Sequence, residues 1–324
     1  MKTYRAEAAY AGLESAADAG LRWDDFCRAA TELLAQAIPF DSMCMGTSDP
    51  ATNLLCGAVM HDLDELTTDE FVGAEYGDPD YNHFVDLARR PVGVSILAEA
   101  TEGQPQLSRR YREFLTRVDI PHEMRSPLRS SGRMWGVVTL YRNTGRSGFS
   151  PGEAAFMHRV EPLLARGLRR GLIVGDLQRA ERSATAAVVI LNAADQVVSA
   201  TDAAEQRFRE LAGDLWSQLP VAVRSVVAAA RGVAGQWVPE MQVRSQVGEW
   251  LTVHAAGVRG PEGLTTDIAV TISPAGPAEI IPLVVAAYGL TEREQDVVQQ
   301  VLAGASTAEI ARRLHLSRTR SRII

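Results

Sequence analysis

The chain has few cysteines and no long apolar run, and each of these features excludes a class of protein. Its three cysteines are odd in number and lie in the first fifth of the 324 residues, at Cys27, Cys44 and Cys56. That pattern is not a disulfide framework, so a reducing cytoplasm is the expected compartment. No stretch has the roughly 20 consecutive apolar residues that cross a bilayer, and MKTYRAEAAYAG lacks a signal-peptide core. A membrane partner is therefore not expected.

Sequence motifs of the common enzyme classes are also missing. There is no Gly-rich phosphate loop and no Gly-x-Ser-x-Gly elbow, and the six histidines show no ligand spacing with cysteines or carboxylates. Neighbouring carboxylates such as Asp62 and Asp64 fit solvated loop charges better than a general acid and base. We therefore expect no enzyme activity, no metal site and no cofactor.

Acidic residues outnumber basic ones, and the net charge of −7 argues against a surface that coats nucleic acid throughout. The C-terminal end differs, because five arginines and no acid occur between Arg312 and Arg322. Such a run attracts phosphate groups.

The first segment, about 1–175, mixes helical and strand patterns. Apolar residues recur at helical spacing in DDFCRAATELLAQAI (24–38), and SMCMGTS (42–48) and NLLCGAVM (53–60) have the pattern of strands. HEMRSPLRSSGRMWGVVTLYR (122–142) has the pattern of two strands around a Ser-Gly turn. These patterns predict helices around an antiparallel sheet.

A long helix is predicted from Pro151, with Ser150 as its cap and Glu153 completing a capping box. One apolar edge continues along it through Leu164, Leu168, Leu172 and Leu177. Two interpretations of this edge stay open. It pairs with a second copy of the chain, giving a homodimer, or it packs on its own domain.

The second segment, about 184–274, begins with TAAVVILNAADQVVSATDAAEQRFREL, which predicts strand, turn, strand and helix. Three further strand candidates follow it. SPAGPAEIIP (273–282), with its prolines and glycine, predicts a linker.

The last segment, 283–324, contains two helix signatures. Thr291 with Glu294 and Ser306 with Glu309 have the spacing of capping boxes. Two such short helices bury their apolar faces only when a third crosses them, as in helix-turn-helix modules. Ser317 would cap that third helix.

LTEREQDVVQQVLAGASTAEIARRLHLS resembles the LuxR-type helix-turn-helix, with the pattern Leu-Thr-x-Arg-Glu, Gly-x-Ser/Thr-x-x-Glu-Ile-Ala and Leu-x-Leu-Ser. The matching residues are Leu290, Thr291, Arg293, Glu294, Gly304, Glu309, Ile310, Ala311, Leu314, Leu316 and Ser317. The resemblance implies that DNA is a partner. The candidate DNA-binding residues are Thr307, Arg312, Arg313, Ser317, Arg318, Thr319, Arg320 and Arg322.

The match breaks after Ser317. The family continues with Thr-Val, a His and a fourth helix, whereas Arg320 and Ser321 stand at the Thr-Val positions here and the sequence ends at Ile324. RTRSRII resembles the family's extreme C-terminus instead, so an internal deletion, a frameshift and a clipped chain are open explanations. Base discrimination needs a rigid recognition helix in the major groove. We therefore expect phosphate attraction with weak sequence preference.

The first segment resembles a GAF domain through AIPFDSMCM, SRRYREFL, HEMRSPLRSSGRMWGVVTLYR and FSPGEAAFMHRVEPLLARGLR. The second resembles a PAS domain through AVVILNAADQVVSATDAAEQRF. Both folds wrap helices around an antiparallel sheet and can enclose a small ligand. We expect an apolar pocket bordered by the first sheet and by DPDYNHF (78–84), with Cys44, Tyr81, Phe84 and Trp135 as candidate lining residues.

The sequence therefore predicts an α+β chain of three domains. These are a GAF-like sensor with its connecting helix (1–175), a PAS-like domain (184–274) and a truncated, all-α helix-turn-helix (283–324). The function hypothesis is a cytoplasmic transcriptional regulator whose sensor domains respond to a small molecule or partner. The alternative is a sensor-only or dominant-negative dimerisation protein with a degenerate tail.

Overall fold

The fold is taken from a computed structural model, which describes residues 2–63, 66–77, 79–174, 185–232, 238–261, 263–302 and 305–314. The chain divides into two compact units, Met1–Gly276 and Pro277–Ile324. The first unit contains two five-stranded antiparallel sheets. The described residues of the second unit form helices only. The α+β class expected from the sequence is confirmed.

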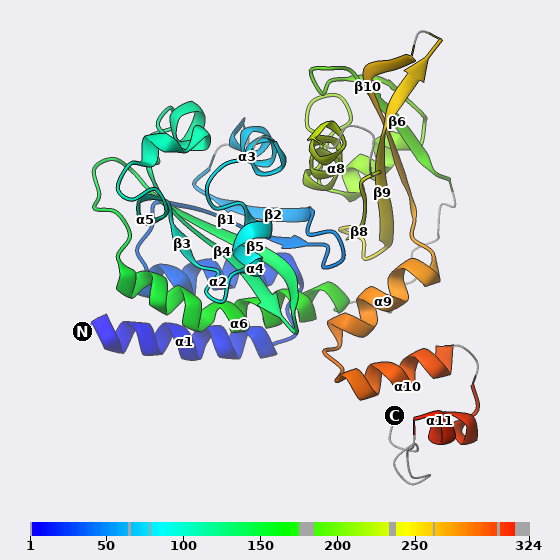
Figure 1. The fold of residues 1–324 in the computed structure, drawn as a ribbon, viewed down its shortest axis with the longest axis horizontal. Coiled ribbons are helices and arrows are strands. Elements are labelled where there is room, and N and C mark those ends of the chain that lie inside the picture. The colour runs from blue at the N-terminus through cyan, green and yellow to red at the C-terminus, as the bar shows by residue number, and fades with distance from the viewer. Residues whose placement is uncertain are drawn as a thin grey trace. The chain divides into compact units, whose positions relative to one another are not determined.

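The longest strand of the first sheet, β5 (Arg133–Arg142), lies at its centre. Its strands are β1 (Ser42–Ser48), β2 (Leu55–His61), β3 (Ser95–Ile96), β4 (His122–Ser130) and β5 (Arg133–Arg142), in the order β2-β1-β5-β4-β3. Its helices are α1 (Lys2–Asp18), α2 (Trp23–Ala37), α3 (Leu66–Tyr76), α4 (Phe84–Arg89), α5 (Leu97–Ala100), the short turns η1 (Pro105–Leu107) and η2 (Tyr111–Leu115), and α6 (Pro151–Ile173). Figure 1 shows α1, α2 and α6 on one side of the sheet and α3 on the other.

The second sheet repeats the strand order of the first. Its strands are β6 (Ala187–Leu191), β7 (Val197–Ala200), β8 (Glu240–Arg244), β9 (Trp250–Gly260) and β10 (Gly263–Pro274), in the order β7-β6-β10-β9-β8. Counted within its own sheet, each order runs second, first, fifth, fourth, third. Helices α7 (Ala204–Glu210) and α8 (Val221–Gly232) pack on this sheet. The strand, turn, strand and helix predicted from residue 185 onward are confirmed, as are the three later strands.

Helix α6 packs its apolar edge inside its own domain. The capping box of Ser150 and Glu153 is present, as predicted. The edge residues Leu164 and Leu168 have no exposed surface, and both belong to the core shared with α1 and α2. The interpretation of this edge as intradomain packing is therefore confirmed for the described residues, and Leu177 lies outside them. A homodimer stays a prediction, now without this edge as its support.

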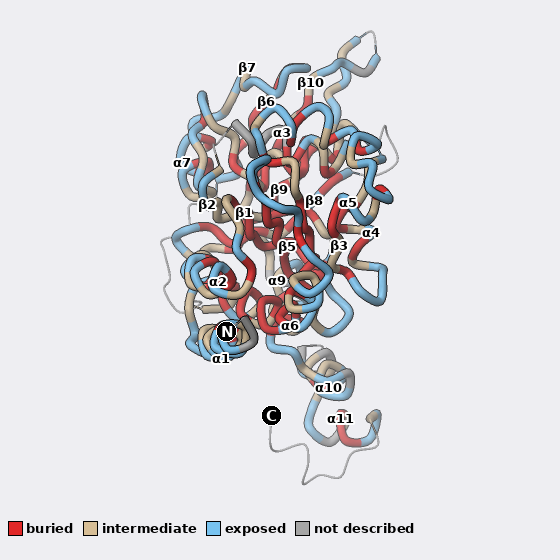
Figure 2. The backbone as a smooth tube through the Cα atoms, turned by 90° about the vertical axis from the view of Figure 1, so that its left-hand side faces the viewer, coloured by how far each residue is buried: buried red, intermediate tan, exposed pale blue. Residues whose placement is uncertain are grey.

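A glycine lets α6 and α2 approach closely. A Cβ atom built on Gly167 would lie 2.2 Å from the ring of Phe26, which is itself fully buried. Only a residue without a side chain fits at this crossing. Figure 2 shows buried residues gathered along the strands of both sheets, where the two apolar cores lie.

The second unit contains α9 (Pro277–Ala287), α10 (Glu292–Leu302) and α11 (Thr307–Arg313). The boundary between the two units lies at Gly276 and Pro277, inside the linker predicted over 273–282, but the connection is shorter than predicted, because β10 continues to Pro274 and α9 begins at Pro277. Proline suits the first turn of a helix, where its missing N–H would have no intrahelical acceptor. None of the helices in the described ranges is long and apolar enough to span a bilayer. The domain boundaries expected from the sequence stay predictions.

Candidate functional site

A small apolar cavity lies on the face of the first sheet opposite α2 and α6. Its free volume is about 20 Å³. Strands β1, β2 and β5 supply its floor, α3 and η2 border it, and α8 of the second sheet contributes one residue. The lining residues are Cys44, Gly46, Leu55, Ala58, Met60, Leu63, Phe71, Val72, Phe114, Val137, Tyr141 and Val221. The expected apolar pocket is thus bordered by the sheet, but its lining includes no described residue of 78–84.

A buried polar residue, Thr139, lies on the same face of β5 as two residues that line the cavity. Thr139 pairs with Cys44 on β1 and with Arg125 on β4. Val137 and Tyr141 line the cavity two residues on either side of Thr139, and alternate residues of a strand face the same side. Thr139 is fully buried, and its Oγ1 has no hydrogen-bond partner among the described residues. The chain therefore places an unpaired hydroxyl on this face of the sheet, although Thr139 itself is not a lining residue of the cavity.

An ion-pair network stands beside this floor. Arg125 Nη1 donates to Glu75 Oε2 (2.7 Å), and its Nε donates to Glu123 Oε1 (3.1 Å). Arg110 donates to both oxygens of Glu123, at 3.0 and 2.7 Å. Both arginine side chains are fully buried, so these carboxylates compensate their charges. The network connects α3, through Glu75, to β4, which carries Glu123 and Arg125, and through Arg110 to the start of η2.

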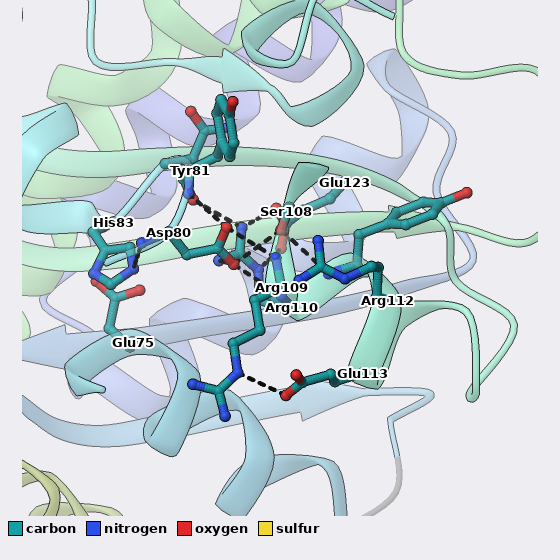
Figure 3. Close-up of polar contacts among 12 residues, drawn as sticks. Glu75, Asp80, Tyr81, His83, Ser108, Arg109, Arg110, Arg112, Glu113 and Glu123 are labelled. Atoms are coloured by element: carbon teal, nitrogen blue, oxygen red, sulfur yellow. Dashed lines mark hydrogen bonds and ion pairs between the residues drawn. The ribbon is translucent and has the colours of Figure 1, made fainter. Parts of the chain in front are cut away.

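Charges determine the ionisation of the carboxylates in this network. Burial by itself raises the pKa of Glu123, but the neighbouring charges of Arg110 and Arg125 outweigh burial and leave that pKa lowered. At Asp80, burial is likewise outweighed by backbone N–H groups of Arg110 and Tyr81, and the pKa is lowered. Figure 3 shows the Asp80 carboxylate facing Ser108 and the Arg109–Arg110 backbone.

The four residues predicted for the pocket are separated in the fold. Cys44 lines the cavity, whereas Tyr81, Phe84 and Trp135 are not among its lining residues. Phe84 packs beneath the guanidinium of Arg125, 4.6 Å from ring centroid to Cζ, and Trp135 Nε1 donates to Ser130 O (3.2 Å). The ligand-binding role of these residues stays a prediction.

The cysteines are free thiols, and Cys44 is unsuited to redox chemistry. Burial raises the pKa of Cys44 to about 12, which keeps the thiol protonated near neutral pH. Cys44 therefore acts as a small apolar residue, since the thiolate is the reactive form of cysteine.

Replacing Thr139 by valine is expected to raise the free energy of unfolding by about 1 kcal/mol, because it removes a buried hydroxyl that lacks a partner. Thr31→Val is the matched control, since Thr31 is also buried but donates to Cys27 O at 2.7 Å. Its loss should lower stability by about 1 kcal/mol. Urea denaturation of the two variants should therefore give opposite signs, and a destabilised Thr139→Val would show that the hydroxyl has a partner.

The second unit presents basic residues at the end of α11. Capping boxes form at Thr291–Glu294 and Ser306–Glu309, as predicted, with Ser306 N donating to Glu309 Oε2 at 2.8 Å. Three predicted DNA contacts are exposed, namely Thr307, Arg312 and Arg313. The other five lie outside the described residues, at Ser317, Arg318, Thr319, Arg320 and Arg322.

Helices α10 and α11, connected by a short segment, form this part of the second unit, and each begins with a capping box. Ile310 and Ala311 of α11 are buried. Residues 289–319 match the family model of bacterial regulatory proteins, luxR family. The C-terminal segment is a LuxR-family domain. The match includes α10 and α11, so the capped helices of the LuxR-family domain and its exposed arginines belong to one module.

Solved structures with a partial likeness to the chain include GAF domains. Two of these GAF domains are the phycoerythrobilin-bound one of a cyanobacterial phytochrome (13% identity, 51% of this chain, 95% of that chain, TM-score 0.36) and that of a Coxiella burnetii phosphoenolpyruvate-protein phosphotransferase (13%, 51%, 93%, 0.33). A third similar structure is the VqsR LBD domain of Pseudomonas aeruginosa (14%, 51%, 95%, 0.35). No curated protein matches the chain.

Proposed function

We propose that the chain is a transcriptional regulator in which two sheet domains control a LuxR-family DNA-binding domain in response to a small molecule. The observation that carries this proposal is the LuxR-family match over residues 289–319. Modules of the helix-turn-helix type place a helix in the major groove and bind DNA. The regulatory part of the proposal rests on the first unit.

The cavity supports a sensing role because both sheet domains contribute to it. Phe71 and Val72 come from α3, which packs on α8, and Val221 at the start of α8 also lines the cavity. A ligand larger than the present space must displace one of these walls. A bound ligand would then change the contact between α3 and α8. The ligand would therefore bind two conformations of the chain with different affinities, which is what it needs to shift the equilibrium between them.

The DNA-binding role would use the exposed face around α11. Arg312 and Arg313 lie in its last turn, and Thr307 lies in its first. Arginine side chains neutralise phosphates, whereas sequence preference requires side chains that reach base edges. The predicted contacts Arg318, Arg320 and Arg322 would add to the phosphate contacts, in keeping with the weak sequence preference expected from the sequence.

The test is a selection from a random duplex pool with the full chain, followed by titration against an enriched and a scrambled duplex at physiological salt. A preference of about a thousandfold, the usual lower scale of specific over non-specific binding, supports a sequence-specific regulator. Binding without preference supports the alternative of a sensor-only or dimerisation protein with a degenerate tail. An Arg312→Ala/Arg313→Ala variant is the control for binding through α11.

A further inference from the structure

A buried carboxylate joins the two sheet domains without a cation beside it. Asp49 follows β1 directly and has 1% exposed surface, and none of the described cations forms an ion pair with it. Buried charges are normally paired or bound to a metal, because an ionised group is costly to remove from water. The carboxylate of Asp49 is therefore compensated by hydrogen-bond donors alone.

The donors to this carboxylate come from both sheet domains. Ala51 N donates to Asp49 Oδ1 (2.8 Å) from the same turn, and Gln242 N donates to Asp49 Oδ2 (3.0 Å) from β8. Beside them, Cys56 Sγ on β2 donates to Gln242 O at 3.5 Å. The first sheet domain thus binds both the N–H and the C=O of one residue in the second sheet.

Gln242 can present both groups because β8 is the edge strand of its sheet. Ala255 N donates to Pro239 O (3.0 Å), and Met241 pairs with β9 in the same register. Backbone groups of successive residues in a strand point in alternate directions. The N–H and C=O of Gln242 therefore point away from β9, and without the first sheet domain they would be an unpaired edge.

An apolar contact completes the junction at the same turn. Leu54 precedes β2 of the first sheet, yet its buried side chain belongs to the core of the second sheet. Leu55 N donates to Tyr76 Oη at 2.8 Å, which fixes the turn to α3. Separation of the two sheets at this point would expose Leu54 and bring water to Asp49.

The titratable groups of β2 and α3 around Asp49 are neutral or paired. Burial raises the pKa of Cys56 and that of Tyr76 well above their ordinary values, so both side chains stay uncharged at and below neutral pH. Glu75, the neighbour of Tyr76 on α3, is paired with Arg125 at 2.7 Å. None of these groups supplies a positive charge to Asp49.

The charged groups of β8 are directed elsewhere. Glu240 is exposed and accepts from Gln242 Nε2 (3.2 Å), and Arg244 donates to Leu172 O of α6. Among the described buried groups of the junction, Asp49 is therefore the one whose charge changes between about pH 4 and pH 7.

The sign of this change follows from the burial of Asp49. Burial raises the pKa of Asp49, because it outweighs the hydrogen bonds that the carboxylate accepts. In an open junction the carboxyl group is hydrated, and its pKa returns to about 3.9. The closed junction therefore binds the proton more readily than the open one. The resulting stabilisation is complete below about pH 4 and is lost as the pH rises through the raised value.

We propose that Asp49 is a proton-controlled latch between the two sheet domains, which closes more tightly in acid and loosens towards neutral pH. This inference goes beyond the proposed function and does not depend on DNA binding. Helix α8 contacts both β2 and α3 at the same junction. Opening of the latch would therefore change the contact between the two sheet domains.

Hydrogen exchange of the full chain, followed by NMR from about pH 7 down to about pH 4, tests the latch. The Gln242 amide bonds to Asp49 and reports opening of the junction, whereas the Ala255 amide bonds within the second sheet and is the internal reference. After correction for the intrinsic exchange rate, protection of Gln242 should rise by up to about tenfold for each pH unit of acidification. Protection of Ala255 should not follow it.

Two variants distinguish this carboxylate from other carboxylates of the domain. Asp49→Asn removes the proton-binding group and should make the protection of Gln242 independent of pH. Asp41→Asn is the matched control, because Asp41 also accepts a backbone N–H, from Asn143 at 2.9 Å, but has a cation partner in Arg146 at 2.8 Å. That variant should keep the pH dependence of the unmodified chain.

Protection of Gln242 that stays constant or falls in acid overturns the proposal. The same follows if Asp49→Asn keeps the pH dependence, or if Ala255 changes in parallel, since the whole second sheet would then be opening. If Asp49→Asn does not fold, the amide proton shift of Gln242 in the unmodified chain decides. A titration midpoint above about 3.9 supports the latch, and a midpoint at or below that value overturns it.

Discussion

Arg125→Met is expected to lower the free energy of unfolding by about 3–5 kcal/mol, the usual cost of removing one partner from a buried ion pair. The guanidinium donates to Glu75 at 2.7 Å and to Glu123 at 3.1 Å, and none of its side chain is exposed. Methionine fills much of the arginine volume, so the loss would come from the uncompensated carboxylates rather than from a cavity. Chemical denaturation measures the difference.

The matched control is Arg89→Met in α4, which removes an exposed ion pair with Asp86 (3.2 Å) and should cost less than about 0.5 kcal/mol. Equal losses in the two variants would contradict a special role for the buried network. Stability that is unchanged in Arg125→Met would show that the network is dispensable.

The pH dependence of the Arg125→Met effect has a definite sign. The pKa of Glu123 is lowered in the folded chain, because the charges of Arg110 and Arg125 outweigh burial. A carboxyl group of this kind contributes stability that is complete above the unfolded-state pKa of about 4.3 and is lost as the pH falls through the lower folded-state value. The stability difference between the wild-type chain and Arg125→Met should therefore shrink in acid below about pH 4.

The parts of the fold that depend on local sequence patterns, such as helix caps and strands, were mostly predictable. The capping boxes at Ser150, Thr291 and Ser306 were predictable because a cap needs only residues three apart. The strands of both sheets follow from alternation and β-branched composition. Helix α8 was not predicted, although Val223, Val226 and Val227 have helical spacing, because a valine-rich run also fits a buried strand.

The candidate site was less predictable because it depends on register between distant strands. Cys44, Thr139 and Arg125 lie in one row only through the pairing of β1 with β5 and of β5 with β4. Alternation along β5 does place Val137, Thr139 and Tyr141 on one face, which was the available signal. Trp135 and Phe84 were expected in the pocket but are not among its lining residues, because a large aromatic residue suits the core as well as a cavity wall.

The packing partner of the leucine edge of α6 was likewise not predictable from the sequence. Its spacing predicts an apolar stripe but not its partner, and the stripe packs on α1, α2 and the first sheet. Gly167 gives a more specific signal, since a glycine inside a helix destabilises it unless another element approaches closely. The glycine therefore indicates a close helix crossing, and in the fold that crossing is with Phe26 of α2.

The affinity of the full chain for a scrambled duplex is expected to fall about 500-fold between 50 and 200 mM salt. Five arginines follow Leu302 without a single acid after Glu309, at Arg312, Arg313, Arg318, Arg320 and Arg322. If each neutralises one phosphate, the logarithm of the binding constant falls with a slope of about −4.5 against the logarithm of salt concentration. Fluorescence anisotropy with a labelled duplex measures this slope.

Removing two of these arginines tests whether the LuxR-family domain or the rest of the chain contacts the phosphates. Arg312→Ala/Arg313→Ala should reduce the slope to about −2.7, a loss of about 40-fold over the same salt range, because two counterions fewer are released. Both side chains are exposed at the end of α11, so their replacement should not disturb packing. Arg89→Ala in α4 removes an equally exposed arginine from the first unit and should leave the slope unchanged. A slope that falls equally in both variants would mean that the sheet domains, and not α11, contact the phosphates.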